Sequence, residues 1–131
     1  MLSLRFDPDA DLILAHADIK GPNNSEQVRL VFDTGASRTE IDSEILTALG
    51  FSEVDKVSDL GFECVTGPTH ETFSVELDTF TALGRTCRNY EVAFVDFSKW
   101  KKDQIDGLLG WDFIRRLHYE QNGPKGLLTI Y

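Results

Sequence analysis

The residues with the clearest potential for chemistry are one carboxylate and the three small residues after it, Asp33-Thr34-Gly35-Ala36. The acid follows a largely apolar run at 28–32, whose alternation predicts a buried strand that ends at Asp33. Thr34 offers a hydroxyl for a local hydrogen bond, and Gly35, which has no Cβ, permits a sharp turn or the close approach of a ligand. This arrangement can direct a carboxylate into a cleft, although aspartate is also common as a structural turn residue.

A second segment near the end of the sequence, Leu108-Leu109-Gly110, makes the pattern around Asp33 more specific. Together, and in this order, the two segments resemble the retropepsin-like aspartic proteases, the single-lobe relatives of pepsin. In that family an Asp-Thr-Gly-Ala loop carries the catalytic acid, and a later segment of two hydrophobic residues and a glycine packs around it. The resemblance covers nearly the whole chain. It implies that Asp33 is the catalytic acid and that the active-site loop is supported by Thr34, Gly35, Ala36, Leu108, Leu109 and Gly110.

The resemblance also implies a reaction, the hydrolysis of a peptide or protein substrate by water held between two carboxyl groups. Aspartic proteases are themselves the usual example of two carboxyls that share one proton. Because this chain has one Asp-Thr-Gly, the second acid is expected from a second copy, in a homodimer with its two Asp33 side chains at the two-fold axis. Asp106 is a weaker candidate for the second acid, since no Thr-Gly follows it. The reaction needs no cofactor and no metal.

Two further parts of the family pattern are matched more loosely. A hairpin usually covers the substrate, and residues 61–73 are the best candidate, with the flap tip at Val65, Thr66, Gly67 and Pro68. The chain ends, 2–6 and 127–131, are apolar enough to pair between subunits. A different class of function is also open: a catalytically inactive domain of the same fold that binds peptides or dimerises. The intact Asp33 motif favours the enzyme.

The pattern along the chain predicts an all-β protein, a closed β-barrel-like acid-protease lobe with two short helices, because many short strands are separated by turns. One helix should start after Asp42 as its cap and stop at Gly50, and the other should span 111–117. The predicted strands are 2–6, 12–19, 28–32, 39–41, two arms within 61–73, 73–77, 90–97, 117–119 and 127–131, with turns at 20–25, 83–85 and 121–126.

Composition sets the remaining expectations. A chain of 131 residues, 41% of them hydrophobic, can form one domain over 1–131 and bury a core without disulfides or metal. The net charge is −9, whereas binding to the phosphates of nucleic acid requires a positively charged surface. Nucleic acid is therefore not an expected partner. Cys64 and Cys87 are expected to be reduced thiols. With neither a signal peptide nor a membrane span apparent, the sequence predicts a cytoplasmic protein.

Overall fold

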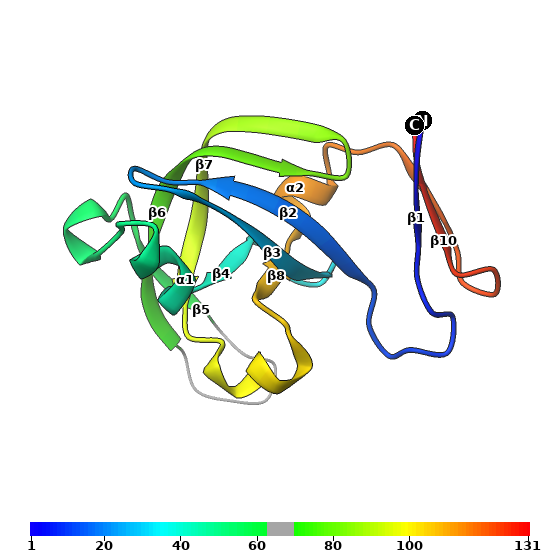
Figure 1. Ribbon diagram of the computed structural model, residues 1–131, viewed down its shortest axis with the longest axis horizontal. Helices are drawn as coiled ribbons and strands as arrows, with labels where there is room; N and C mark the ends of the chain where they lie inside the picture. Colours follow the sequence, from blue (N-terminus) through cyan, green and yellow to red (C-terminus); the bar gives the residue numbers. More distant parts are fainter. Residues whose placement is uncertain (63–69) are drawn as a thin grey trace.

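A computed structural model describes residues 1–62 and 70–131, and its strands form two sheets, with short helices between some of the strands (Figure 1). The strands are β1 Leu2–Arg5, β2 Leu14–Lys20, β3 Ser25–Phe32, β4 Glu40–Asp42, β5 Asp59–Phe62, β6 His70–Ala82, β7 Arg85–Val95, β8 Gly107–Leu109, β9 Tyr119–Asn122 and β10 Leu127–Ile130. The helices are α1 Ser43–Ala48 and α2 Trp111–Ile114, with 3-10 segments η1 Glu53–Asp55 and η2 Ser98–Asp103.

The larger sheet closes on itself. Its strands follow the order β2-β3-β8-β4-β7-β6-β5, and β2 also pairs with β6, so that six strands complete a barrel within the described residues. Closure depends on the long β6–β7 hairpin, whose strands have 13 and 11 residues, because β6 reaches β5 at one end and β2 at the other. The predicted all-β, barrel-like lobe is therefore confirmed.

The barrel interior is filled by the inward-facing residues of alternating strands. In β2, for example, Ala15, Ala17 and Ile19 are buried while the residues between them are exposed. One end of the core is aromatic: the rings of Phe80 and Phe113 lie 5.3 Å apart, so α2 contributes directly to the interior. Packing of Phe113 in the core therefore fixes the position of α2 after β8.

The chain ends form the smaller sheet, β1-β10-β9. Within one chain β1 and β10 pair with each other, with Leu2 opposite Ile130 and Arg5 opposite Leu127 in one antiparallel ladder. Pairing of the chain ends between subunits stays a prediction. The ladder continues into the connection after β1, where the Phe6 amide donates to Gly126 O at 2.9 Å. Figure 1 shows the two termini side by side at one end of the molecule.

The helices agree with the sequence in type and differ in extent. Helix α1 has the predicted cap, Asp42, but α2 ends after four residues, at Ile114, instead of reaching residue 117. The sequence did not predict η1 or η2, since neither shows an apolar periodicity; η2 is a charged run that ends at Gln104 in the left-handed conformation, with φ of 58°. Within the described ranges no helix combines the length and apolar character needed to cross a membrane.

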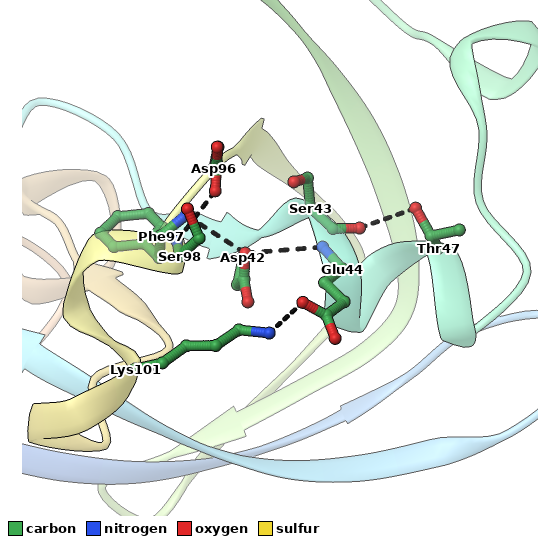
Figure 2. A network of polar contacts seen from close by, with 8 residues as sticks. All are labelled: Asp42, Ser43, Glu44, Thr47, Asp96, Phe97, Ser98 and Lys101. Carbon is green, nitrogen blue, oxygen red and sulfur yellow. Dashed lines mark hydrogen bonds and ion pairs between the residues drawn. The ribbon is translucent and has the colours of Figure 1, made fainter.

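Asp42 joins three elements through one carboxylate (Figure 2). Its side chain is 3% exposed, and Oδ1 accepts from the Phe97 amide at 3.2 Å and from the Glu44 amide at 3.5 Å. On the exposed side of this contact, Lys101 of η2 forms an ion pair with Glu44 of α1. The buried acid therefore holds the start of α1 against the residues that lead into η2.

Replacing Asp42 by alanine is expected to lower the free energy of unfolding by about 2 kcal/mol, because a helix cap and a buried acceptor are lost together. Asp96→Ala is a matched control, since Asp96 is exposed and accepts from the nearby Ser98 amide. Urea denaturation of the two variants measures the difference. Equal, small losses for both would contradict the role given to Asp42.

Candidate active site

Asp33 stands at the point where β3 leaves the barrel. Its amide donates to Leu109 O at 2.9 Å, which continues the parallel pairing of β3 with β8 by one residue. Its side chain is half-buried, and Oδ1 accepts from the Gly35 amide at 2.9 Å. The Ala36 amide closes the turn by donating to Asp33 O at 3.2 Å. The carboxylate is thus held by its own turn, while Thr34 and Gly35 are exposed at the tip.

The segment Leu108-Leu109-Gly110 lies against this turn. Strand β8 runs between β3 and β4, with Leu108 opposite both Val31 and Glu40. Leu109 is fully buried in the core, whereas Leu108 is half-buried on the other face of the sheet. Just beyond β8, the Trp111 amide donates to Ala36 O at 2.7 Å. Together with the bond from the Asp33 amide to Leu109 O, this contact ties the end of β8 to both sides of the turn.

Gly110 is required here by space. A Cβ on Gly110 would lie 2.4 Å from the carbonyl carbon of Arg38 and 2.8 Å from the Thr39 amide nitrogen, closer than any side chain can approach backbone. The backbone at the end of β8 therefore lies in direct contact with the backbone of Arg38 and Thr39, which follow the Asp33 turn. These contacts agree with the supporting role predicted for Leu108, Leu109 and Gly110, which remains a prediction as regards catalysis.

A buried polar network lies beneath the turn, and the sequence did not indicate it. The Thr39 hydroxyl donates to Asp112 Oδ1 at 2.9 Å and accepts from the Gly110 amide at 3.2 Å, while the Tyr90 hydroxyl donates to Asp112 Oδ2 at 2.7 Å. Burial, and then the hydrogen bond to Asp112, raise the pKa of Tyr90. Asp112 belongs to α2, whereas its partners Thr39 and Tyr90 lie 73 and 22 residues away in the sequence.

Glu40 is a second residue that the sequence analysis missed. It alternates in β4 with the buried Ile41, which faces the core, so Glu40 faces outward beside Leu108. Burial, and then the nearby charge of Asp33, raise the pKa of Glu40 from 4.5 to about 7. Two carboxyl groups of one chain therefore lie on the same face of the sheet. The alternation at 39–41 signalled the outward direction of Glu40, but not its proximity to Asp33.

The raised pKa of Glu40 predicts a pH-dependent stability. Between pH 4.5 and about 7 the folded protein binds more protons at Glu40 than the unfolded chain, so this residue's contribution to stability falls as pH rises through that window. Above it, the buried charge costs about 1 to 3 kcal/mol. Glu40→Gln should therefore raise the free energy of unfolding at pH 8 and change it little at pH 4. Urea titrations at both pH values test this, and an equal effect at the two would contradict it.

The flap residues Val65, Thr66, Gly67 and Pro68 lie outside the described residues. The arms that lead to them are paired: β5 is antiparallel to the start of β6, with Asp59 opposite Phe73 and Phe62 opposite His70. The position of a flap tip at 65–68 stays a prediction. Asp106, the weaker candidate for a second acid, accepts from the Arg29 amide at 2.9 Å and so has a structural contact of its own.

Comparison with known proteins finds a matching family and similar solved structures. The model of a family described as aspartyl protease matches residues 15–113, a range that includes the Asp33 turn and the Leu108 segment. Among solved structures, a retropepsin-like aspartic protease from Rickettsia conorii has a TM-score of 0.70, with 18% sequence identity over 98% of this chain and 88% of that one. At this identity the likeness establishes the retropepsin-like fold. A search of curated proteins finds no significant match.

Proposed function

The chain belongs to the aspartyl protease family, and on this basis we propose that it is an aspartic endopeptidase that acts as a homodimer. The observation that carries the proposal is the Asp33 turn at the end of a barrel strand: the half-buried carboxylate accepts from the Gly35 amide, and the Asp33 backbone amide donates to Leu109 O. In the proposal Asp33 is the catalytic residue, and Thr34, Gly35, Ala36, Leu108, Leu109 and Gly110 hold the loop that carries it.

Hydrolysis of a peptide bond without a metal needs one group to accept a proton from water and another to protonate or hydrogen-bond the carbonyl oxygen. Two adjacent carboxyls that share one proton do both, and their pKa values then belong to the pair. Glu40 is near Asp33, but it belongs to β4, and the residues opposite it on the neighbouring strands, Leu108 and Ala93, are apolar. The proposed second acid is therefore the Asp33 of another copy.

The space around Gly35 is a second observation in favour of the homodimer. Among the described residues, a Cβ there would meet only Asp33 Oδ1, at 3.2 Å, so this part of the chain leaves open space above the turn, unlike the space around Gly110. Thr34 is exposed beside it. In a two-fold dimer this exposed tip would meet its symmetry mate, and the two Asp33 side chains would face each other across the axis.

The proposal is tested by incubating the protein with a mixture of denatured proteins between pH 4 and pH 7 and identifying the products by mass spectrometry. We expect defined cleavage that is blocked by a statine-type peptide, which mimics the tetrahedral transition state. Cleavage that resists this inhibitor would contradict the aspartic mechanism. If peptides bind and none is cut at any pH, the inactive peptide-binding domain is the correct interpretation.

A further inference from the structure

We propose that Glu40 makes the site selective for peptides with a lysine or arginine side chain next to the scissile bond. This inference rests on the proposed peptidase function and goes beyond it, because it names a feature of the substrate. It assigns Glu40 a role in recognition, whereas Asp33 carries the reaction.

The strand register places Glu40 on the same face as Asp33. Residues directly opposite one another in paired strands point to the same side of a sheet. Leu108 is opposite both Val31 and Glu40, so these three residues share one face, and Asp33 lies two residues beyond Val31 on that face. The residues between them, including Phe32, Ile41 and Leu109, are in the barrel core. A peptide that reaches Asp33 therefore passes over the face that carries Glu40.

The two residues directly opposite Glu40 on the neighbouring strands are apolar. Its cross-strand partners are Leu108 on β8 and Ala93 on β7. Burial between them is the first cause of its raised pKa, and the charge of Asp33 is the second. A half-buried carboxylate costs free energy unless a cation or hydrogen-bond donors compensate for it. A lysine or arginine side chain of the substrate would supply both.

The fold itself does not use this carboxylate: the side-chain hydrogen bonds and ion pairs formed among residues 1–62 and 70–131 do not include the Glu40 side chain. The other charged groups around it already have partners. Arg38 lies 3.6 Å from Glu91, which also accepts from Ser74. Asp106 accepts from the Arg29 amide, and Asp33 from the Gly35 amide. Arg38, two residues before Glu40 in the sequence, is thus paired with a different acid.

The selectivity should depend on pH and symmetry. With a pKa of about 7, Glu40 is mostly ionised above neutral pH and mostly neutral in acid, so the preference for a cation should weaken as pH falls. In a two-fold dimer each copy places one Glu40 on its own side of the Asp33 pair. The preference should therefore appear at equivalent substrate positions on both sides of the cleaved bond.

The test uses peptides that are identical except at one position, which is lysine in one and norleucine, its uncharged analogue, in the other. Affinity is measured by fluorescence anisotropy at pH 7.5 with the Asp33→Asn protein, so that no cleavage is needed. We expect the lysine peptide to bind about tenfold more tightly, and we expect Glu40→Gln in the same background to remove the difference.

Glu91→Gln is the matched control, because Glu91 is an acid on the neighbouring strand that is already paired, and it should keep the preference. Equal affinity for the two peptides, or a preference that survives Glu40→Gln, would overturn the assignment of Glu40 and leave the peptidase proposal to be decided by cleavage. If the preference for the lysine peptide depends on Glu40 but the wild-type protein cleaves no peptide, the recognition role of Glu40 is supported and the proposed peptidase function is rejected. No binding of either peptide would reject both.

Discussion

Replacing Asp33 by asparagine is expected to lower the rate of peptide cleavage by about 1,000-fold or more, because an amide can neither accept the proton of the attacking water nor share a proton with a second carboxyl. The change is nearly isosteric, and the carbonyl oxygen of asparagine can still accept from the Gly35 amide. Removing the Asp33 charge also relieves its repulsion with Glu40. The variant should therefore fold normally, which thermal unfolding would verify beside the kinetic assay.

Asp18→Asn is the appropriate control for this change, since Asp18 is an exposed acid on β2 that faces away from the core. It should keep wild-type activity and stability. Wild-type cleavage by a well-folded Asp33→Asn protein would remove the catalytic role assigned to Asp33, and would leave the retropepsin-like fold as the established property of the chain.

Replacing Gly110 by alanine should cause a large loss of stability. The added Cβ would meet the Arg38 carbonyl carbon at 2.4 Å, and relief requires the backbone around Thr39 to move. That movement would break the hydrogen bond from the Gly110 amide to the Thr39 hydroxyl, and would strain the contacts that hold the Asp33 turn. We expect a loss of about 3 kcal/mol or more, measured by urea denaturation, or no soluble folded protein at all.

Gly123→Ala provides the comparison, because a Cβ at Gly123 meets nothing within 4 Å and its φ lies outside the left-handed region. This variant should change the free energy of unfolding by less than about 0.5 kcal/mol. A similar loss of unfolding free energy in the two alanine variants would show that replacing any glycine has this cost. The close backbone contact at Gly110 would then not explain the effect.

Much of this fold follows from local patterns. The alternation in β2 and in the strand before Asp33 predicts half-buried strands, and Asp42 with Gly50 marks the two ends of α1. The motif order around Asp33 and Leu108 predicts a retropepsin-like lobe, which the family and structure matches support. Such signals are readable because each depends on neighbours a few residues apart.

The remaining features depend on contacts between distant segments. Glu40 lies near Asp33 because β8 enters the sheet between β3 and β4, about 70 residues later in the sequence. The Thr39, Asp112 and Tyr90 network likewise joins three separate elements. The pairing of β1 with β10 joins the two ends of the chain. No local pattern carries this information, so the acid that we propose for substrate recognition was found only in the structure.

The central claim, that two copies share one site, is tested most directly by mixing active and inactive chains. Wild-type and Asp33→Asn proteins are unfolded together in varied proportions, refolded at constant total concentration, and assayed for peptide cleavage. If activity needs two Asp33 side chains, it follows the square of the wild-type fraction, so that an equal mixture keeps about one quarter of the wild-type rate. Activity proportional to the wild-type fraction, with about half the rate in that mixture, would show that each chain cuts alone and would contradict the account.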